Sequence, residues 1–338
     1  MKRIVICADG TWQSPESEHP THVMRLARAI APVDGRGRKQ VVFYDWGIGS
    51  EGDRIKGGAT GAGIDKNIMD AYRFIVHNYD PGDALFFFGF SRGAYTVRSL
   101  GGFIRNCGVL HRSQAARIPE AYELYRTRSP QSAPGEDRAT AFRKLYAVAD
   151  RTEIAFVGVW DTVGALGIPA PFIGTLNSGR YLFHDAEPSS IIRCARHAVA
   201  IDEKRADFAP TLWSHKPGID LQQVWFSGVH TDIGGGYANH ALGDHAGVWM
   251  AREAEAAGLR FEPHFMAQLQ PDHRAKQHNE YKGVYKLLGR GEDRRVEPCL
   301  HQSVRQRWDE PDLTLRSPAL RALLDRLGGD WSRITLAA

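Results

Sequence analysis

A serine between two glycines is the first feature of the sequence that could do chemistry. It lies in Gly89-Phe90-Ser91-Arg92-Gly93, after an apolar run at 84–88 and before helical spacing at 94–104. Strand, tight glycine turn and helix is the context in which a nucleophile elbow exposes a serine hydroxyl. The free amides at the start of the helix can hold a developing oxyanion. The motif predicts that Ser91 is a nucleophile; the alternative interpretation is a serine that caps the helix.

A serine hydroxyl needs a base to remove its proton and an acid to orient that base. In the elbow fold these residues follow in the order serine, acid, histidine, each at the carboxyl end of a strand. Asp161 directly follows an apolar run at 154–160, and His230 follows another at 221–226. Ligands of open parallel sheets bind at this edge. We therefore expect Ser91, Asp161 and His230 to form a catalytic triad.

Other residues compete for two of these roles. His301 is the alternative base, and Asp232 is the alternative acid, which becomes the better acid if His301 is the base. Asp232 lies so close to His230 in the chain that it would need an unusual local geometry to serve it. His111 and His197 could also fold back towards Ser91. The position after a strand and beside a glycine-rich turn favours His230.

The amide of Arg92, directly after the nucleophile, is the first expected oxyanion donor. The amide of Thr11 could be the second, because an early strand–helix loop has this role in the elbow fold. Asp9, in the same loop, either lies at the substrate or holds the elbow through a hydrogen bond to Arg92. The residues expected to contact the substrate are Asp9, Trp12, Phe90 and Phe172.

Strand-like and helix-like segments alternate along the chain. Short apolar runs predict buried strands at 4–8, 41–44, 84–88, 154–160 and 221–226. Helical spacing recurs at 23–31, 67–78 and 94–104. This alternation predicts an α/β fold of the α/β-hydrolase type, a mostly parallel sheet with helices on both faces. We expect one domain over 1–310 with a helical insertion at about 111–151, and a helical C-terminal tail at 311–338. No strand is predicted beyond Gly243.

Two segments have a binding interpretation that we set against a plainer one. The glycine-rich stretch 57–63 lacks the Lys-Ser/Thr ending of a phosphate loop and the third glycine of a dinucleotide fingerprint. We interpret it as an active-site rim; the alternative is phosphate-ester chemistry with a metal near Asp9 and Asp232. The block 290–295 mixes charge signs and predicts a solvated loop.

The four cysteines are scattered, so neither a zinc site nor a disulfide framework is indicated. We expect no metal and no cofactor.

Composition excludes several classes of protein. The chain has 338 residues and a net charge of +4, from 43 basic and 39 acidic residues, which is too small and dispersed an excess to indicate nucleic-acid binding. No apolar stretch approaches the roughly 20 residues that span a bilayer. Asp9 interrupts the first apolar run before a signal peptide would be complete. We expect a cytoplasmic protein, with specialised secretion and peripheral membrane contact left open. The oligomeric state is not indicated.

Several motifs together carry a family resemblance. In chain order they are Asp9-Gly10-Thr11-Trp12, Gly89-Phe90-Ser91-Arg92-Gly93-Ala94, Val159-Trp160-Asp161-Thr162-Val163-Gly164, Ile201-Asp202-Glu203-Lys204-Arg205, the block 225–237 around His230, and His301-Gln302-Ser303-Val304. With them the chain resembles the uncharacterised α/β-hydrolase domain family that includes the first family of type VI secretion lipase effectors. The resemblance implies a serine-dependent phospholipase A or a related esterase.

The sequence thus predicts a serine hydrolase that cleaves carboxylic esters of a lipid or other ester substrate through an acyl-enzyme. The alternative is a catalytically inactive scaffold or binding protein that keeps the α/β-hydrolase fold. Labelling of Ser91 by a fluorophosphonate would separate the two.

Overall fold

The computed structural model describes residues 1–10, 16–47, 61–127, 130–164, 187–289, 291–313 and 317–338. Predicted site residues Thr11, Trp12 and Phe172 lie outside these ranges, as do 57–60 of the glycine-rich stretch. No helix in the described ranges is both long and apolar enough to cross a bilayer.

Eight strands form one sheet in the order β2-β1-β3-β4-β5-β6-β7-β8, and every neighbouring pair is parallel. The carboxyl ends of all eight strands therefore lie at the same edge. The strands are β1 (Arg3–Ala8), β2 (Gln40–Asp45), β3 (Ala84–Phe90), β4 (Ile154–Trp160), β5 (Ile192–Ala200), β6 (Asp220–Phe226), β7 (Cys299–His301) and β8 (Thr335–Ala337).

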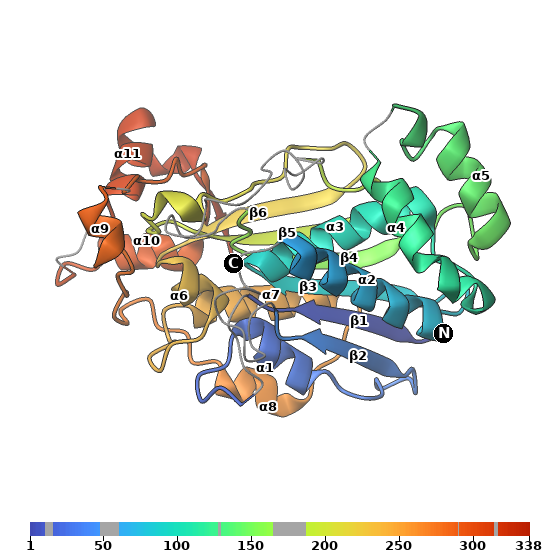
Figure 1. Ribbon diagram of the computed structural model, residues 1–338. Coiled ribbons are helices and arrows are strands. Elements are labelled where there is room, and N and C mark those ends of the chain that lie inside the picture. Colours follow the sequence, from blue (N-terminus) through green and yellow to red (C-terminus); the bar gives the residue numbers. More distant parts are fainter. Residues whose placement is uncertain (11–15, 48–60, 128–129, 165–186, 290, 314–316) are drawn as a thin grey trace.

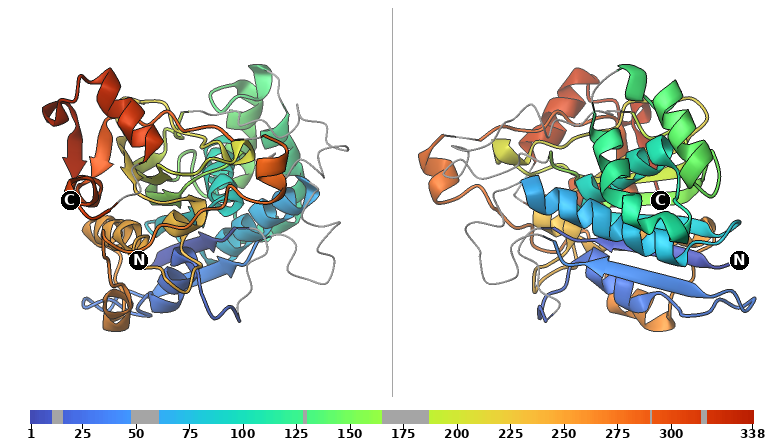
Figure 2. Two further views of the ribbon diagram at one scale, coloured as in Figure 1. Left: turned by 90° about the vertical axis from the view of Figure 1, so that its left-hand side faces the viewer. Right: turned by 45° about the vertical axis from the view of Figure 1, so that its right-hand side comes forward.

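Side chains of the central strands alternate between two apolar cores. On β1, Ile4 and Ile6 pack into the first core, whereas Val5 and Cys7 pack into the second. Strands buried on both faces carry continuous apolar runs, which is why these strands were recognisable in the sequence. The first core is covered by α2 (Gly61–Asn78), α3 (Arg92–Cys107), α4 (Ile118–Arg126) and α5 (Asp137–Tyr146). The second is covered by α1 (His22–Ala29), α7 (Asp244–Ala256) and α8 (Pro263–Gln268) (Figures 1 and 2). The predicted α/β fold with helices on both faces is confirmed.

A third apolar core lies beside the last strands of the sheet. Trp225 and Leu300 pack there against α10 (Gln302–Asp309) and α11 (Pro318–Arg326). The prediction of no strand beyond Gly243 is wrong, because β7 and β8 extend the sheet and β8 lies in the segment expected to be a helical tail. Strands of three residues are too short to show the alternation of apolar and polar residues by which a strand is recognised in a sequence.

Strand β5 was also not predicted, although it lies between β4 and β6. Arg193, Arg196 and His197 interrupt its apolar run. Arg196 is buried because it pairs with Asp220 and Glu253, two partners that the sequence of the strand does not show. The remaining short helices are η1 (Arg112–Arg117), η2 (Pro130–Ser132), η5 (Ala206–Phe208), α6 (His230–Gly234), α9 (Val284–Leu287) and η6 (Trp331–Arg333).

Candidate active site

Ser91 occupies a sharp turn between β3 and α3. Its backbone is left-handed, with φ 58° and ψ −121°, a conformation rare for a residue with a side chain. The flanking glycines make the turn sterically allowed: a Cβ on Gly89 would lie 2.5 Å from the carbonyl oxygen of Gly93, and one on Gly93 would lie 2.0 Å from that of Ala8. The Ser91 side chain makes no hydrogen bond that caps α3. The helix-capping interpretation therefore does not explain this serine.

His230 is the first residue of α6, in the turn that follows β6 at the carboxyl edge of the sheet, where α6 is seen in Figure 1. Its Nε2 lies 2.9 Å from Ser91 Oγ, and its Nδ1 lies 2.6 Å from Asp161 Oδ2. An ionised carboxylate accepts from Nδ1–H, which leaves Nε2 as the acceptor for the serine hydroxyl. The ring is held between Phe90 and Phe208, with centroid distances of 4.6 and 5.0 Å.

Asp161 directly follows β4 and is fully buried. Like Ser91 it has a positive φ, 38°, and these are the two non-glycine residues with that property in the described ranges. Its Oδ1 accepts from the amide of Ala200 at 2.9 Å, so β5 fixes one side of the carboxylate. The structure thus brings Ser91, His230 and Asp161 together in the arrangement expected from the sequence. Their positions at the ends of β3, β4 and β6 explain why.

Arg294 holds the other side of the Asp161 carboxylate. Its Nη1 donates to Oδ1 at 2.6 Å and its Nη2 to Oδ2 at 3.0 Å, and the same nitrogens donate to the carbonyls of Ala200 and Phe208. The sequence placed Arg294 in a solvated loop; this is wrong for Arg294, which is 8% exposed. Burial alone would raise the pKa of Asp161, but the charge of Arg294 and the bond to His230 hold it well below its usual range. No short motif marks this arginine in the sequence.

Glu203 is a second residue beside Asp161 and His230 for which no role was predicted from the sequence. Its Oε2 accepts from the backbone amide of His230 at 3.3 Å, at the start of α6. Burial would raise the pKa of Glu203, but Arg205, which forks onto both carboxylate oxygens, lowers it. An ionised carboxylate at a helix N-terminus stabilises that terminus. Glu203 therefore helps to fix where His230 begins its helix.

The loop after β1 lies against the nucleophile. A Cβ on Gly10 would be 3.4 Å from Ser91 Cβ and 3.3 Å from the ring of Phe90. The backbone of Gly10 therefore lies in close contact with Ser91 and Phe90. Of the two expected oxyanion donors, Arg92 is the first residue of α3 and directly follows Ser91. Thr11, the other expected donor, lies outside the described residues.

Comparison with known proteins identifies the family. Residues 2–253 match the family described as type VI secretion system (T6SS), phospholipase effector Tle1-like, catalytic domain. The chain belongs to this family. Over 239 residues it is 27% identical to an uncharacterized protein of Saccharomyces cerevisiae, a match that covers 64% of this chain and 33% of that protein.

Two solved structures are similar to this Tle1-like chain. One is an uncharacterized protein from Pseudomonas aeruginosa, with 17% identity, 80% of this chain and 49% of that chain covered, and a TM-score of 0.48. The other is the Tle1 effector bound to the VgrG spike of the type VI secretion system, with 21% identity, coverages of 70% and 51%, and a TM-score of 0.37. The chain spans about a third to a half of the length of these relatives.

In this Tle1-like domain the alternative base is held elsewhere. His301 stacks on Phe226 with a centroid distance of 4.8 Å, and its Nδ1 lies 2.8 Å from Ser303 Oγ. His197 accepts from the amide of Thr162 and contacts Gln223 through its other nitrogen. The histidine at Ser91 is therefore His230, and neither His301 nor His197 takes that place.

Asp232, the alternative acid, pairs with His278 and not with His230. His278 Nδ1 lies 2.6 Å from Asp232 Oδ1, and the His278 ring stacks on Tyr237. Asp232 Oδ2 accepts from the amide of Val229 at 2.9 Å, at the N-terminus of α6. Asp232 thus supports the helix that begins with His230.

Asp9 lies under the loop rather than at its surface. Its carboxylate accepts from the amide of Gly10 at 2.8 Å, from the hydroxyl of Tyr44 at 2.9 Å and from the hydroxyl of Thr21. Burial raises its pKa to about 6, against the effect of these donors. Asp9 is 1% exposed, so its observed contacts are those of a loop anchor. Within the described ranges, no three His, Cys, Asp or Glu side chains are arranged to hold a metal ion, at Asp9 and Asp232 or elsewhere.

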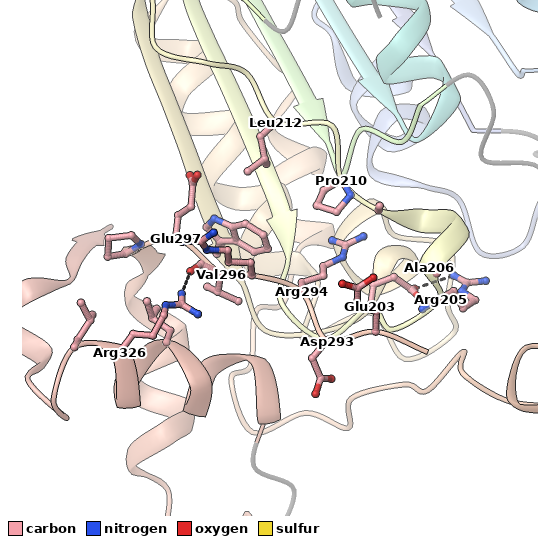
Figure 3. A pocket seen from close by; sticks show the side chains of 17 residues that line it. Glu203, Arg205, Ala206, Pro210, Leu212, Asp293, Arg294, Val296, Glu297 and Arg326 are labelled. Atoms are coloured by element: carbon pink, nitrogen blue, oxygen red, sulfur yellow. Dashed lines mark hydrogen bonds and ion pairs between the residues drawn. The ribbon is translucent and has the colours of Figure 1, made fainter. Parts of the chain in front are cut away.

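A pocket of about 580 Å³ is lined in part by Arg294, the residue that holds Asp161 (Figure 3). Its lining includes Glu203, Arg205, Arg294 and Arg326, together with apolar residues of the third core, but not Ser91, Asp161 or His230. Arg294 therefore lies between the triad acid and this pocket.

Proposed function

We propose that this Tle1-like domain hydrolyses carboxylic esters of phospholipids, with Ser91 as nucleophile and an acyl-enzyme as intermediate. The observation that carries the proposal is the position of the His230 imidazole, which lies 2.9 Å from Ser91 Oγ and 2.6 Å from Asp161 Oδ2. Family membership supports a phospholipid as the substrate class. Membership of this effector family also supports delivery by a type VI secretion system.

The first half of the reaction forms the acyl-enzyme. Ser91 Oγ attacks the ester carbonyl while its proton passes to Nε2 of His230. Asp161 keeps the proton on Nδ1 and stabilises the imidazolium that forms. The carbonyl oxygen becomes an oxyanion beside the N-terminus of α3, where the amide of Arg92 is the proposed donor. Collapse of the tetrahedral intermediate expels the alcohol, which takes the proton from Nε2.

The second half repeats these steps with water. Nε2 of His230 accepts a proton from a water molecule as its oxygen attacks the acyl carbonyl of Ser91. The second tetrahedral intermediate releases the carboxylic acid and returns the proton to Ser91 Oγ. His230 and Asp161 have the same roles in both halves, whereas Ser91 is the nucleophile in the first half and the leaving group in the second.

Labelling by a fluorophosphonate tests the nucleophile and the competence of the site together. We expect the folded protein to be labelled at Ser91, as located by mass spectrometry, and to release fatty acid from phospholipid vesicles. Ser91→Ala should abolish both, and Ser99→Ala, at a serine within α3, should leave both intact. A folded wild-type protein that neither reacts nor hydrolyses, under conditions that label a known serine hydrolase, would favour the inactive scaffold.

A further inference from the structure

Arg294 reaches the triad acid from far along the chain. It follows Asp161 by 133 residues and lies beyond the stretch 2–253 that matches the family. Its side chain is nevertheless buried, and each of its two terminal nitrogens donates to one carboxylate oxygen and one backbone carbonyl. A planar guanidinium that bonds a carboxylate through two parallel bonds fixes both its position and its orientation.

We propose that Arg294 is a positioning residue that locks the rotamer of Asp161 and sets the pH range in which His230 acts as a base. This inference rests on the proposed function, since it assigns a role in the same reaction. It concerns a residue that touches neither the substrate nor the reacting atoms.

The bonds to the two carboxylate oxygens show how the rotamer is locked. Oδ1 accepts from Ala200 and Arg294, and Oδ2 accepts from His230 and Arg294. Rotation of the carboxylate would break bonds on both oxygens in a site that excludes water. Since His230 Nδ1 is aimed by Oδ2, the position of Nε2 at Ser91 depends on this rotamer.

The charge of Arg294 acts on the proton of His230 as well. A carboxylate shared with a guanidinium attracts an imidazolium less strongly than a carboxylate that faces the imidazole alone. Arg294 should therefore extend activity to lower pH.

The other charged groups around the pair do not duplicate this effect. Glu203 faces the amide of His230 and is neutralised by Arg205. His197, near Asp161, is fully buried; burial lowers its pKa to about 3, so it carries no charge in the range where His230 acts. Arg98 lies next to His197 rather than at the carboxylate. Arg294 is thus the cation in direct contact with Asp161.

The test compares Arg294→Met and Arg294→Lys with a matched control, Arg295→Met. Arg295 is the exposed neighbour in the same segment, and its replacement should change nothing. The readouts are kcat, KM and the pH profile of kcat/KM on a soluble ester, with the thermal unfolding temperature to verify folding.

For Arg294→Met we expect the acid limb of the profile to move up by about 1 pH unit, since a charge this close shifts ionisation by that order. We expect kcat to fall by about 10- to 100-fold with KM little changed, because a misplaced base slows the chemical step. Arg294→Lys keeps the positive charge but cannot form the two parallel hydrogen bonds to the carboxylate. We expect its kcat to fall as well, with a smaller shift of the acid limb of the pH profile.

A folded Arg294→Met protein with the wild-type profile would overturn the proposal. If Arg294→Met does not fold, Arg294→Lys decides alone: unchanged kcat and an unchanged acid limb in a folded protein would also overturn it. Failure of the proposed function looks different, because the wild-type protein itself would then show neither hydrolysis nor labelling of Ser91.

Discussion

Two carboxylate–imidazole pairs each have one member in α6, and they share one geometry. In both, Nδ1 of a histidine lies 2.6 Å from a buried carboxylate oxygen: His230 with Asp161, and His278 with Asp232. They differ in what the rest of each residue touches. Nε2 of His230 is at a serine hydroxyl, whereas the His278 ring stacks on Tyr237 and is 23% exposed. The histidine–carboxylate contact alone therefore does not identify a catalytic pair.

The two carboxylates also differ in charge compensation. Burial raises the pKa of Asp232, and the donors Val229 and His278 do not reverse this effect. Burial acts on Asp161 in the same direction, but Arg294 and His230 reverse it and the pKa is lowered. A full positive charge in direct contact is the main difference. It keeps Asp161 ionised, which is the state that can orient a histidine base.

Replacing each histidine should give the largest contrast between the pairs. His230→Ala removes the base, and we expect kcat on an ester to fall by about 10⁶-fold. His278→Ala removes a partly exposed ring that touches neither Ser91 nor Asp161, and we expect a loss of about tenfold or less. Steady-state kinetics on a soluble ester measures both, with thermal unfolding as the control for folding. Equal losses in two folded variants would refute the distinction.

Replacing each carboxylate by its amide should give the next largest contrast. Asp161→Asn can no longer hold the proton on Nδ1 of His230, and loss of this orientation costs about 10⁴-fold in comparable triads. Asp232→Asn alters the contact with His278 and the support of the N-terminus of α6, and it touches neither Ser91 nor the imidazole of His230. We expect Asp232→Asn to lower kcat by about tenfold at most. A drop as large as that of Asp161→Asn would mean that Asp232 belongs to the catalytic machinery.

The parts of the site that could be predicted are those with local signals. Ser91 lies in a turn whose glycines are required by the contacts they make, and such turns are visible in sequence. Asp161 and His230 follow apolar strands whose ends must share an edge in a parallel sheet. The choice of His230 over His301 was also open in the sequence. It was settled by strand order, since β7 lies at the far side of β6 from β3.

The parts that could not be predicted depend on contacts between distant segments. Arg294 stands among residues of both charge signs, and only the carboxylate of Asp161 explains why this one arginine is buried. Strand β5 carries Arg196, whose partners Asp220 and Glu253 lie on β6 and α7. Strands β7 and β8 are three residues long and are defined by their pairing. In each case the local sequence indicates a loop or a polar segment, and tertiary contacts decide otherwise.

The smallest expected effect is a difference in how each carboxylate makes stability depend on pH. The raised pKa of Asp232 means that, above the unfolded value of about 4, the folded state holds its proton longer than the unfolded chain does. Asp232 therefore loses stabilising effect as pH rises through this window. The lowered pKa of Asp161 has the opposite sign: its contribution is present above about pH 4 and is lost as pH falls.

Denaturant unfolding between pH 3 and pH 6 can measure both signs against the amide variants. The free energy of unfolding of wild type relative to Asp232→Asn should fall as pH rises above 4. Relative to Asp161→Asn it should rise between pH 3 and 4 and then stay constant, because the folded carboxylate remains ionised throughout. Each variant serves as the control for the other, since both replace a buried carboxylate by an amide. Slopes of the same sign would contradict the assignment of opposite charge compensation to the two pairs.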